Sequence, residues 1–184
     1  MGSLASMATA LAVALAAVLA FAGCMSSEDD HTTAKTFREN GFAIEFSYPG
    51  DLREIRHVPV AEAVGGSAAK QAAIGLSAKD VILVERYDLH EPIGRAELAI
   101  AKAELDALLN RTSFDTKRQR TTTIGGHPAL VYEGRVGAPT HAHSRLVVIF
   151  DGDREYFLNC QYVNERRRIE RACEEAMRTM RVVG

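Results

Sequence analysis

RLVVIFDGDREYFLNCQY, residues 145–162, is the stretch of sequence that decides the fold of this chain. Residues 145–150 are nearly all aliphatic, which is typical of a central strand that is covered on both faces. Asp151-Gly152 is the strongest short hairpin signal in the chain, because this dipeptide tolerates the backbone angles of a tight turn. Residues 155–162 then form the returning strand. The stretch therefore predicts a β-hairpin within a mainly antiparallel sheet.

The residues after this hairpin predict a helix over about residues 165–181. Asn164 can cap its first turn, because an asparagine side chain accepts hydrogen bonds from free helix amides. Apolar side chains then recur at spacings of three and four, which places them on one stripe. The stripe consists of Ile169, Ala172, Cys173, Ala176, Met177 and Met180. We expect it to pack on the face of the returning strand that carries Cys160.

The three cysteines predict one disulfide. Cys160 and Cys173 lie on the two faces that should pack together. With Cys24 assigned to lipid, as argued below, they are an even pair, and an oxidising compartment favours their bridging. The bridge would close a short loop, which in the chain-entropy model contributes on the order of 3 kcal/mol.

Period-two alternation of apolar and polar residues predicts further strands. They cover residues 42–48, 52–58, 72–76, 81–89, 114–124 and 129–136. A second apolar set has helical spacing and predicts an amphipathic helix over about residues 95–110. This set consists of Leu98, Ala101, Leu105, Leu108 and Leu109. Residues 61–73 are rich in alanine, glycine and serine, which predicts a surface loop.

The first 23 residues predict an export signal. They contain no Asp, Glu, Lys or Arg, and the apolar run at residues 10–22 suits a cleavable signal better than a spanning helix. Residues 21–24, Phe-Ala-Gly-Cys, resemble the lipobox of bacterial lipoproteins, in which the cysteine thiol accepts diacylglycerol before cleavage. Lipidation would make Cys24 the new N-terminus. An ordinary secretory signal cut nearby and an uncleaved anchor are the alternatives, and both keep the domain outside.

The rest of the chain predicts a short tether followed by one domain. Residues 24–36 are mostly polar, as a flexible tether between lipid and fold should be. Residues 37–184 have a length that suits a single domain with its own core. The formal net charge of the whole chain is -2, which gives no electrostatic reason to expect a nucleic-acid partner.

Three local motifs resemble the PsbP-like family. They are FAIEFSYP at residues 42–49, IGGHPA at residues 124–129 and DREYFL at residues 153–158. The resemblance covers residues 37–183 and, with the lipobox, is closest to exported actinobacterial lipoproteins of the LpqN-like group. It implies an α/β fold, namely an α/β/α sandwich with a mainly antiparallel central sheet. Members of the family act by binding proteins and share no active site, so the resemblance implies no catalytic residue and no cofactor.

Candidate chemical sites are few. His141 and His143, with His127 or His90 nearby, are candidates for a transition-metal site if a strand directs both imidazoles to one face. No acidic or cysteine ligand has a supporting spacing, so we favour solvated histidines at a strand end. The chain contains no Gly-x-Ser-x-Gly nucleophile elbow. We therefore expect neither a metal nor enzymatic activity.

Two basic runs carry the remaining hypotheses. Residues 166–168 with Arg171, or Lys117-Arg118 with Arg120, would reach anionic lipid headgroups if the lipid holds the domain at a membrane. The alternative that we favour is that they are solvated faces. We expect a non-enzymatic protein-binding or accessory module of the cell envelope, acting through the sheet or the loop at residues 61–73. The competing hypothesis is a carrier or sensor of a small apolar ligand held between sheet and helices.

Overall fold

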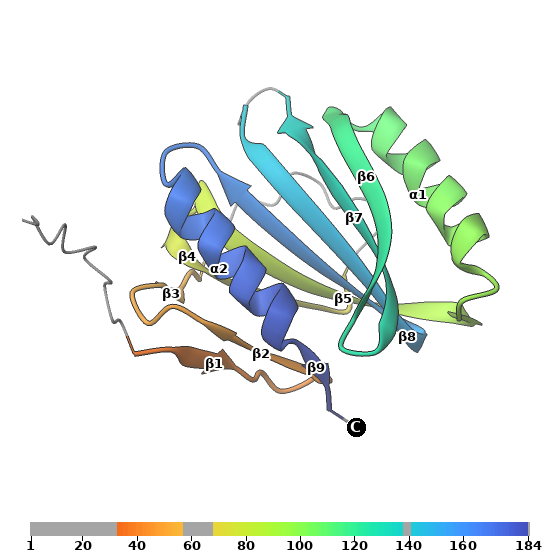
Figure 1. Cartoon of the computed structure of the whole chain (residues 1–184), viewed down its shortest axis with the longest axis horizontal. Helices are drawn as coiled ribbons and strands as arrows, with labels where there is room; N and C mark the ends of the chain where they lie inside the picture. The colour runs from red at the N-terminus through yellow and green to blue at the C-terminus, as the bar shows by residue number, and fades with distance from the viewer. Residues whose placement is uncertain (1–32, 57–67, 138–140, 184) are drawn as a thin grey trace, which may run out of the picture. The chain divides into compact units, whose positions relative to one another are not determined.

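The computed structural model describes residues 33–56, 68–137 and 141–183 (Figure 1). Two helices and nine strands form in these residues. In chain order they are β1 (Lys35–Phe37), β2 (Ile44–Tyr48), β3 (Arg53–Glu54), β4 (Lys70–Ser77), β5 (Asp80–Ile93), α1 (Leu98–Arg111), β6 (Phe114–Ile124), β7 (His127–Val136), β8 (His143–Tyr162), α2 (Arg166–Thr179) and β9 (Arg181–Val182).

The larger sheet has the strand order β3-β4-β5-β8-β7-β6, and all these pairs are antiparallel. The long strand β8 reverses direction at Asp151-Gly152, where Gly152 has a φ of 61°. Its two halves lie side by side. This is shown by the hydrogen bond from the Ser144 hydroxyl to the side-chain oxygen of Asn159, fifteen residues further along the chain, at 2.6 Å. The first half pairs with β7 and the second with β5 (Figure 1). The predicted hairpin is confirmed.

A smaller antiparallel sheet has the order β1-β2-β9. Phe37 of β1 packs against Phe46 of β2 and against Phe42, which precedes β2, and all three rings belong to the same buried cluster as the stripe of α2. The C-terminal strand β9 pairs with β2, so the smaller sheet and α2 share one side of the molecule.

Alternation along the strands of the larger sheet divides the core in two. One set of side chains, including Val131, Val147 and Leu158, packs against the stripe of α2. The other set, including Tyr132, Leu146 and Phe157, packs against Ala101, Leu105 and Leu109 of α1. Each helix buries the stripe that its spacing predicts, and the two helices cover opposite faces. The predicted α/β/α sandwich is confirmed.

Two predicted segments differ from the structure. A strand was predicted over residues 52–58, but among the described residues only Arg53–Glu54 form a strand there, β3. The predicted loop at residues 61–73 is wrong at its end, because Lys70 to Ala73 belong to β4 and pair with β5. Their low β-propensity is overridden by pairing with a long neighbouring strand. Residues 61–67 lie outside the described part of the chain.

The cap of the second helix also differs from the prediction. The N-cap residue is Glu165, not Asn164, and it makes no capping hydrogen bond with its own side chain. The Asp80 carboxylate at the start of β5 accepts hydrogen bonds from the backbone amides of Val163, Asn164 and Glu165, each at 2.9 Å. A residue more than eighty positions away thus fixes the N-cap residue and the two residues before it, whereas the local sequence predicted a side-chain cap on the first turn.

Candidate functional site

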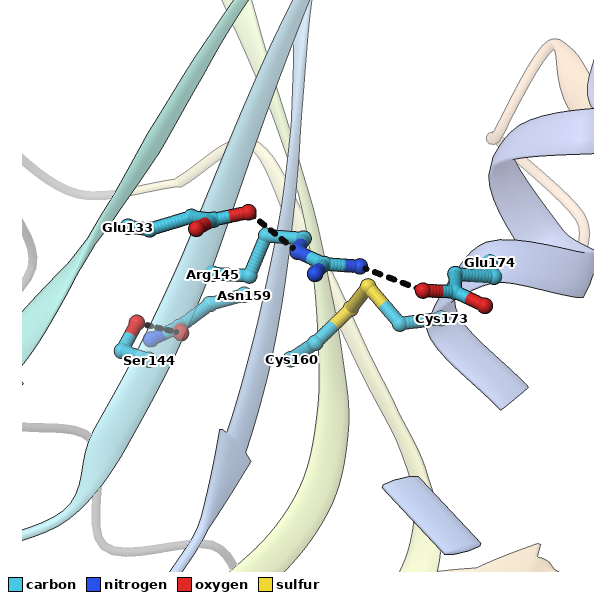
Figure 2. Close-up of a disulfide and its surroundings, with 7 residues drawn as sticks. All are labelled: Glu133, Ser144, Arg145, Asn159, Cys160, Cys173 and Glu174. Atoms are coloured by element: carbon cyan, nitrogen blue, oxygen red, sulfur yellow. Dashed lines mark hydrogen bonds and ion pairs between the residues drawn. A yellow bond between two sulfur atoms is a disulfide. The ribbon is translucent and has the colours of Figure 1, made fainter. Parts of the chain in front are cut away.

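The disulfide fixes α2 to the sheet. Cys160 of β8 and Cys173 of α2 are bonded, with their Cα atoms 6.0 Å apart (Figure 2). Both residues are buried, because the apolar stripe of the helix lies against the strand face that carries Cys160. The bond agrees with the pairing that the sequence predicts, and it places a covalent link in the floor of a cleft.

Polar contacts also hold the N-terminal end of α2. Burial opposes ionisation of Asp80, but hydrogen bonds from three backbone amides and the Ser77 hydroxyl hold its pKa below the usual range. Arg168, in the first turn of the helix, donates hydrogen bonds to the Asp51 carboxylate in the turn between β2 and β3. A negative carboxylate at a helix N-terminus also complements the helix dipole. This end of α2 is therefore anchored to two separate loops.

A cleft of about 350 Å³ opens between α2 and strands β6, β7 and β8. Its volume is in the range of ligand-binding pockets. Basic side chains dominate its lining: Lys117, Arg118, Arg135, Arg145 and Arg166. Among the described residues, two carboxylates, Glu133 and Glu170, line it with them, while Asp115 and Glu174 pair with Lys117 and Arg145 from outside the lining. The cleft therefore carries a surplus of positive charge, although the whole chain is slightly negative.

The carboxylates neutralise only part of this charge. Arg145 lies 3.1 Å from Glu133 and 3.5 Å from Glu174, so it bridges β7 and α2 (Figure 2). Arg166 pairs with Glu170 at 3.1 Å, one helical turn away. In contrast, Arg118 lies 3.9 Å from Glu133 with its side chain 84% exposed.

Arg135 is exposed and has no ion pair within the described part of the chain. Arg118 and Arg135 are thus the cations in the cleft with the weakest neutralisation. Both remain accessible to an anionic ligand.

Two stacked rings form the flat part of the cleft wall. The imidazole of His143 is parallel to the phenol ring of Tyr162, with centroids 5.2 Å apart. The Tyr162 hydroxyl donates a hydrogen bond to Glu170 at 2.9 Å. Burial and this nearby carboxylate raise the pKa of Tyr162. The wall therefore presents an aromatic surface beside the charged rim.

The candidate metal histidines do not form the predicted pair. His143 begins β8, but His141 precedes the strand and has a φ of 49°, so the two do not share one strand face. The prediction assumed regular extended backbone through both residues, which the turn geometry at His141 interrupts. His127 lies 3.4 Å from Asp151, outside the cleft. Among the described residues, no group of three or more metal-ligating side chains is present.

One residue of the second basic run, Arg166, meets the first run at the cleft, whereas Arg167, Arg168 and Arg171 do not line it. Lys117 and Arg118 line it from β6, and Arg166 lines it from α2. Arg120 lies beside it, in a shallow depression on β6 and β7. Residues 117–120 and Arg166 are almost fifty positions apart, so only the tertiary fold brings them together.

The opposite face of the sheet buries acidic side chains that the sequence analysis did not single out. Glu85 is 6% exposed and accepts hydrogen bonds from Gln71 at 2.9 Å and Tyr87 at 3.3 Å. Burial raises the pKa of Glu85. Burial and the neighbouring Glu104 raise the pKa of Glu155 to about 7. The available signal was that Glu85 stands in an otherwise apolar set of alternate positions, between Leu83 and Tyr87.

Comparison with solved structures identifies the fold. No family model matches the chain, and no curated protein matches it. The solution structure of cyanobacterial PsbP (CyanoP) from Synechocystis sp. PCC 6803 aligns with a TM-score of 0.50 at 12% identity, over 82% of this chain and 93% of that one.

The fold is PsbP-like. A crystal structure from Bacteroides thetaiotaomicron VPI-5482 aligns with a TM-score of 0.54 at 12% identity, over 82% of this chain and 48% of that one. At such low identity the similarity describes the PsbP-like fold alone.

Two further features bear on the sequence hypotheses. The predicted lipidation residue Cys24 lies outside the described residues, and neither α1 nor α2 is long and apolar enough to cross a membrane. Residues 67–70 have the spacing Ser-x-x-Lys of some acyl-transfer enzymes, which the sequence analysis overlooked. Ser67 also lies outside the described residues, while Lys70 begins β4, so the structure does not test this pair.

Proposed function

We propose that this protein is a lipid-anchored, non-enzymatic module of the cell envelope that binds an acidic region of a partner protein in the basic cleft. The observation that carries the proposal is the surplus of positive charge around Arg118 and Arg135, framed by a helix that a disulfide holds in place. Complementary charge across an interface steers association and selects partners. A rigid wall reduces the entropy lost when the partner binds.

The proposed location rests on the N-terminal sequence and the disulfide. Structural disulfides persist in oxidising compartments outside the cytoplasm, which agrees with an exported domain. A lipid on Cys24 would hold the cleft close to the membrane. The intact mass of protein extracted from membranes tests this. We expect a chain that begins at Cys24 with a diacylglycerol-sized addition, and two thiols that appear only after reduction. An unlipidated mass would contradict the anchor.

The hydrogen bonding of Ser144 supports a binding role over a catalytic one. Ser144 is buried, and its hydroxyl contacts Asn159 and not the adjacent His143. Neighbouring residues on a strand point to opposite faces, so His143 is not positioned to activate Ser144 as a nucleophile. The basic side chains of the cleft favour an anionic ligand over the small apolar ligand considered above, which stays a prediction.

Charge reversal in the cleft tests the binding function. The variant Arg118→Glu/Arg135→Glu changes two exposed side chains. In cells, cross-linking followed by mass spectrometry should lose the partners that the wild-type protein captures. Arg95→Glu is the control, because this exposed arginine precedes α1 and does not line the cleft. Arg95→Glu should retain the partners of the wild-type protein. If Arg118→Glu/Arg135→Glu also retains them, the cleft is not the binding site.

A further inference from the structure

Strand β6 is a long, exposed edge of the larger sheet. It is last in the strand order, and within the described residues it pairs only with β7. Its eleven residues include no proline or glycine, and most of its side chains are exposed. The outer backbone groups of an edge strand can pair with another strand. This edge is therefore a template for strand addition.

The register of β6 leaves a regular segment for such pairing. The strand has an irregularity between Thr116 and Arg118, where its register with β7 shifts. From Arg118 to Ile124 the pairing with β7 is continuous, and three of these positions are consecutive threonines, which favour extended backbone. Natural edge strands are commonly protected by shortness, by proline, by bulges or by charged side chains. After its single irregularity, β6 has neither proline nor a further bulge over seven residues, and its protection there is the positive charge of Arg118 and Arg120.

The charges of β6 select the strand that can pair with it. Arg118 and Arg120 occupy alternate positions, so both lie on the cleft side of the sheet with Glu133 and Val131 of β7. Arg120 forms no ion pair within the described part of the chain, and Arg118 has only the distant Glu133. Like charges that face one another across a strand pair destabilise it, whereas opposite charges stabilise it. A second copy of β6 is thus disfavoured, and an acidic strand is favoured.

We propose that the edge of β6 binds an extended acidic segment of the partner protein as an added β-strand, with its carboxylates facing Arg118 and Arg120. The inference rests on the proposed function, because the adjoining cleft would bind the same acidic partner. In this mode of recognition, backbone hydrogen bonds provide affinity and alternate side chains provide specificity. Lys117, whose amine lies 2.7 Å from Asp115, contributes less because it is already neutralised.

Synthetic peptides test the added strand and separate it from simple charge attraction. The first peptide alternates threonine with glutamate, and the second has the same sequence with an N-methyl group on every backbone amide, so that neither edge can donate strand hydrogen bonds. Fluorescence anisotropy at about 0.15 M salt measures their affinities for the full chain. Methylation removes strand hydrogen bonds but keeps the charge, so we expect the second peptide to bind at least tenfold more weakly. A peptide that alternates threonine with lysine should not bind.

Two variants complete the test. Arg118→Glu/Arg120→Glu should weaken the first peptide by at least tenfold, whereas Arg95→Glu should leave its affinity unchanged. If the methylated peptide binds as tightly as the first one, strand addition is wrong while the basic cleft stands as the binding site. If neither acidic peptide binds, strand addition is also overturned, and the cross-linking of cleft variants independently decides the proposed function.

Discussion

The two faces of the larger sheet hold their helices by different means. On one face, α2 is fixed by the disulfide, by the cap from Asp80 and by the pairing of Arg168 with Asp51. On the other face, α1 is held mainly by apolar packing, and its Asp106 accepts a hydrogen bond from Tyr132 at 2.8 Å. The face with the covalent and ionic anchors is the one that carries the basic cleft. The contrast indicates that α2 is built as a fixed wall of a binding site, whereas α1 mainly completes the core.

Of the anchors that distinguish α2 from α1, the disulfide should contribute most to the free energy of unfolding. The bond links residues thirteen positions apart, and closing such a loop contributes about 3 kcal/mol in the chain-entropy model. Cys160→Ala/Cys173→Ala should lower the free energy of unfolding in urea by about that amount. A reductant should destabilise the wild-type protein in the same way and leave the double variant unchanged. Equal stability of the oxidised wild-type protein and the variant would show that the disulfide does not stabilise the fold.

Loss of the distant cap should have the next largest effect. Asp80→Ala leaves three backbone amides without their acceptor, which should cost about 2–3 kcal/mol in urea unfolding. Asn164→Ala is the matched control, because Asn164 was the cap expected from sequence but makes no such bond in the structure. It should cost less than about 0.5 kcal/mol. The reverse order of these two effects would show that the local residue caps the helix.

The pH dependence of stability should differ in sign between the faces. The pKa of Glu155 is raised to about 7, so its contribution favours the folded state at acidic pH and is lost as the pH rises through about 7. The pKa of Asp80 is lowered, so its contribution is present near neutral pH and is lost in acid. Glu155→Gln should match the wild-type protein near pH 4 and exceed its stability by about 2–3 kcal/mol near pH 8. A pH-independent difference in urea unfolding would contradict the raised pKa of this carboxyl group.

Local patterns in the sequence were sufficient for much of the fold. The hairpin at Asp151-Gly152 and the stripes of both helices follow from residue spacing, and the pairing of Cys160 with Cys173 follows from which faces carry them. The start of β4 at Lys70 and Gln71 was missed because neighbouring strands override weak local preferences.

The site was harder to predict because its parts are distant in sequence. The cap from Asp80, the meeting of β6 with the start of α2, and the irregular backbone at His141 all depend on tertiary structure. The arginines were visible in the sequence, but their common cleft was not.

A two-dimensional NMR titration of the isotopically labelled protein with the threonine–glutamate peptide tests the central claim most directly. We predict that the amide signals that shift belong to β6 and the adjoining cleft, with the largest changes at Arg118, Arg120 and Arg135. The signals of α1 should stay unchanged. Shifts that cluster on the α1 face, or no shifts at peptide concentrations that saturate the anisotropy signal, would contradict the basic cleft as the binding site.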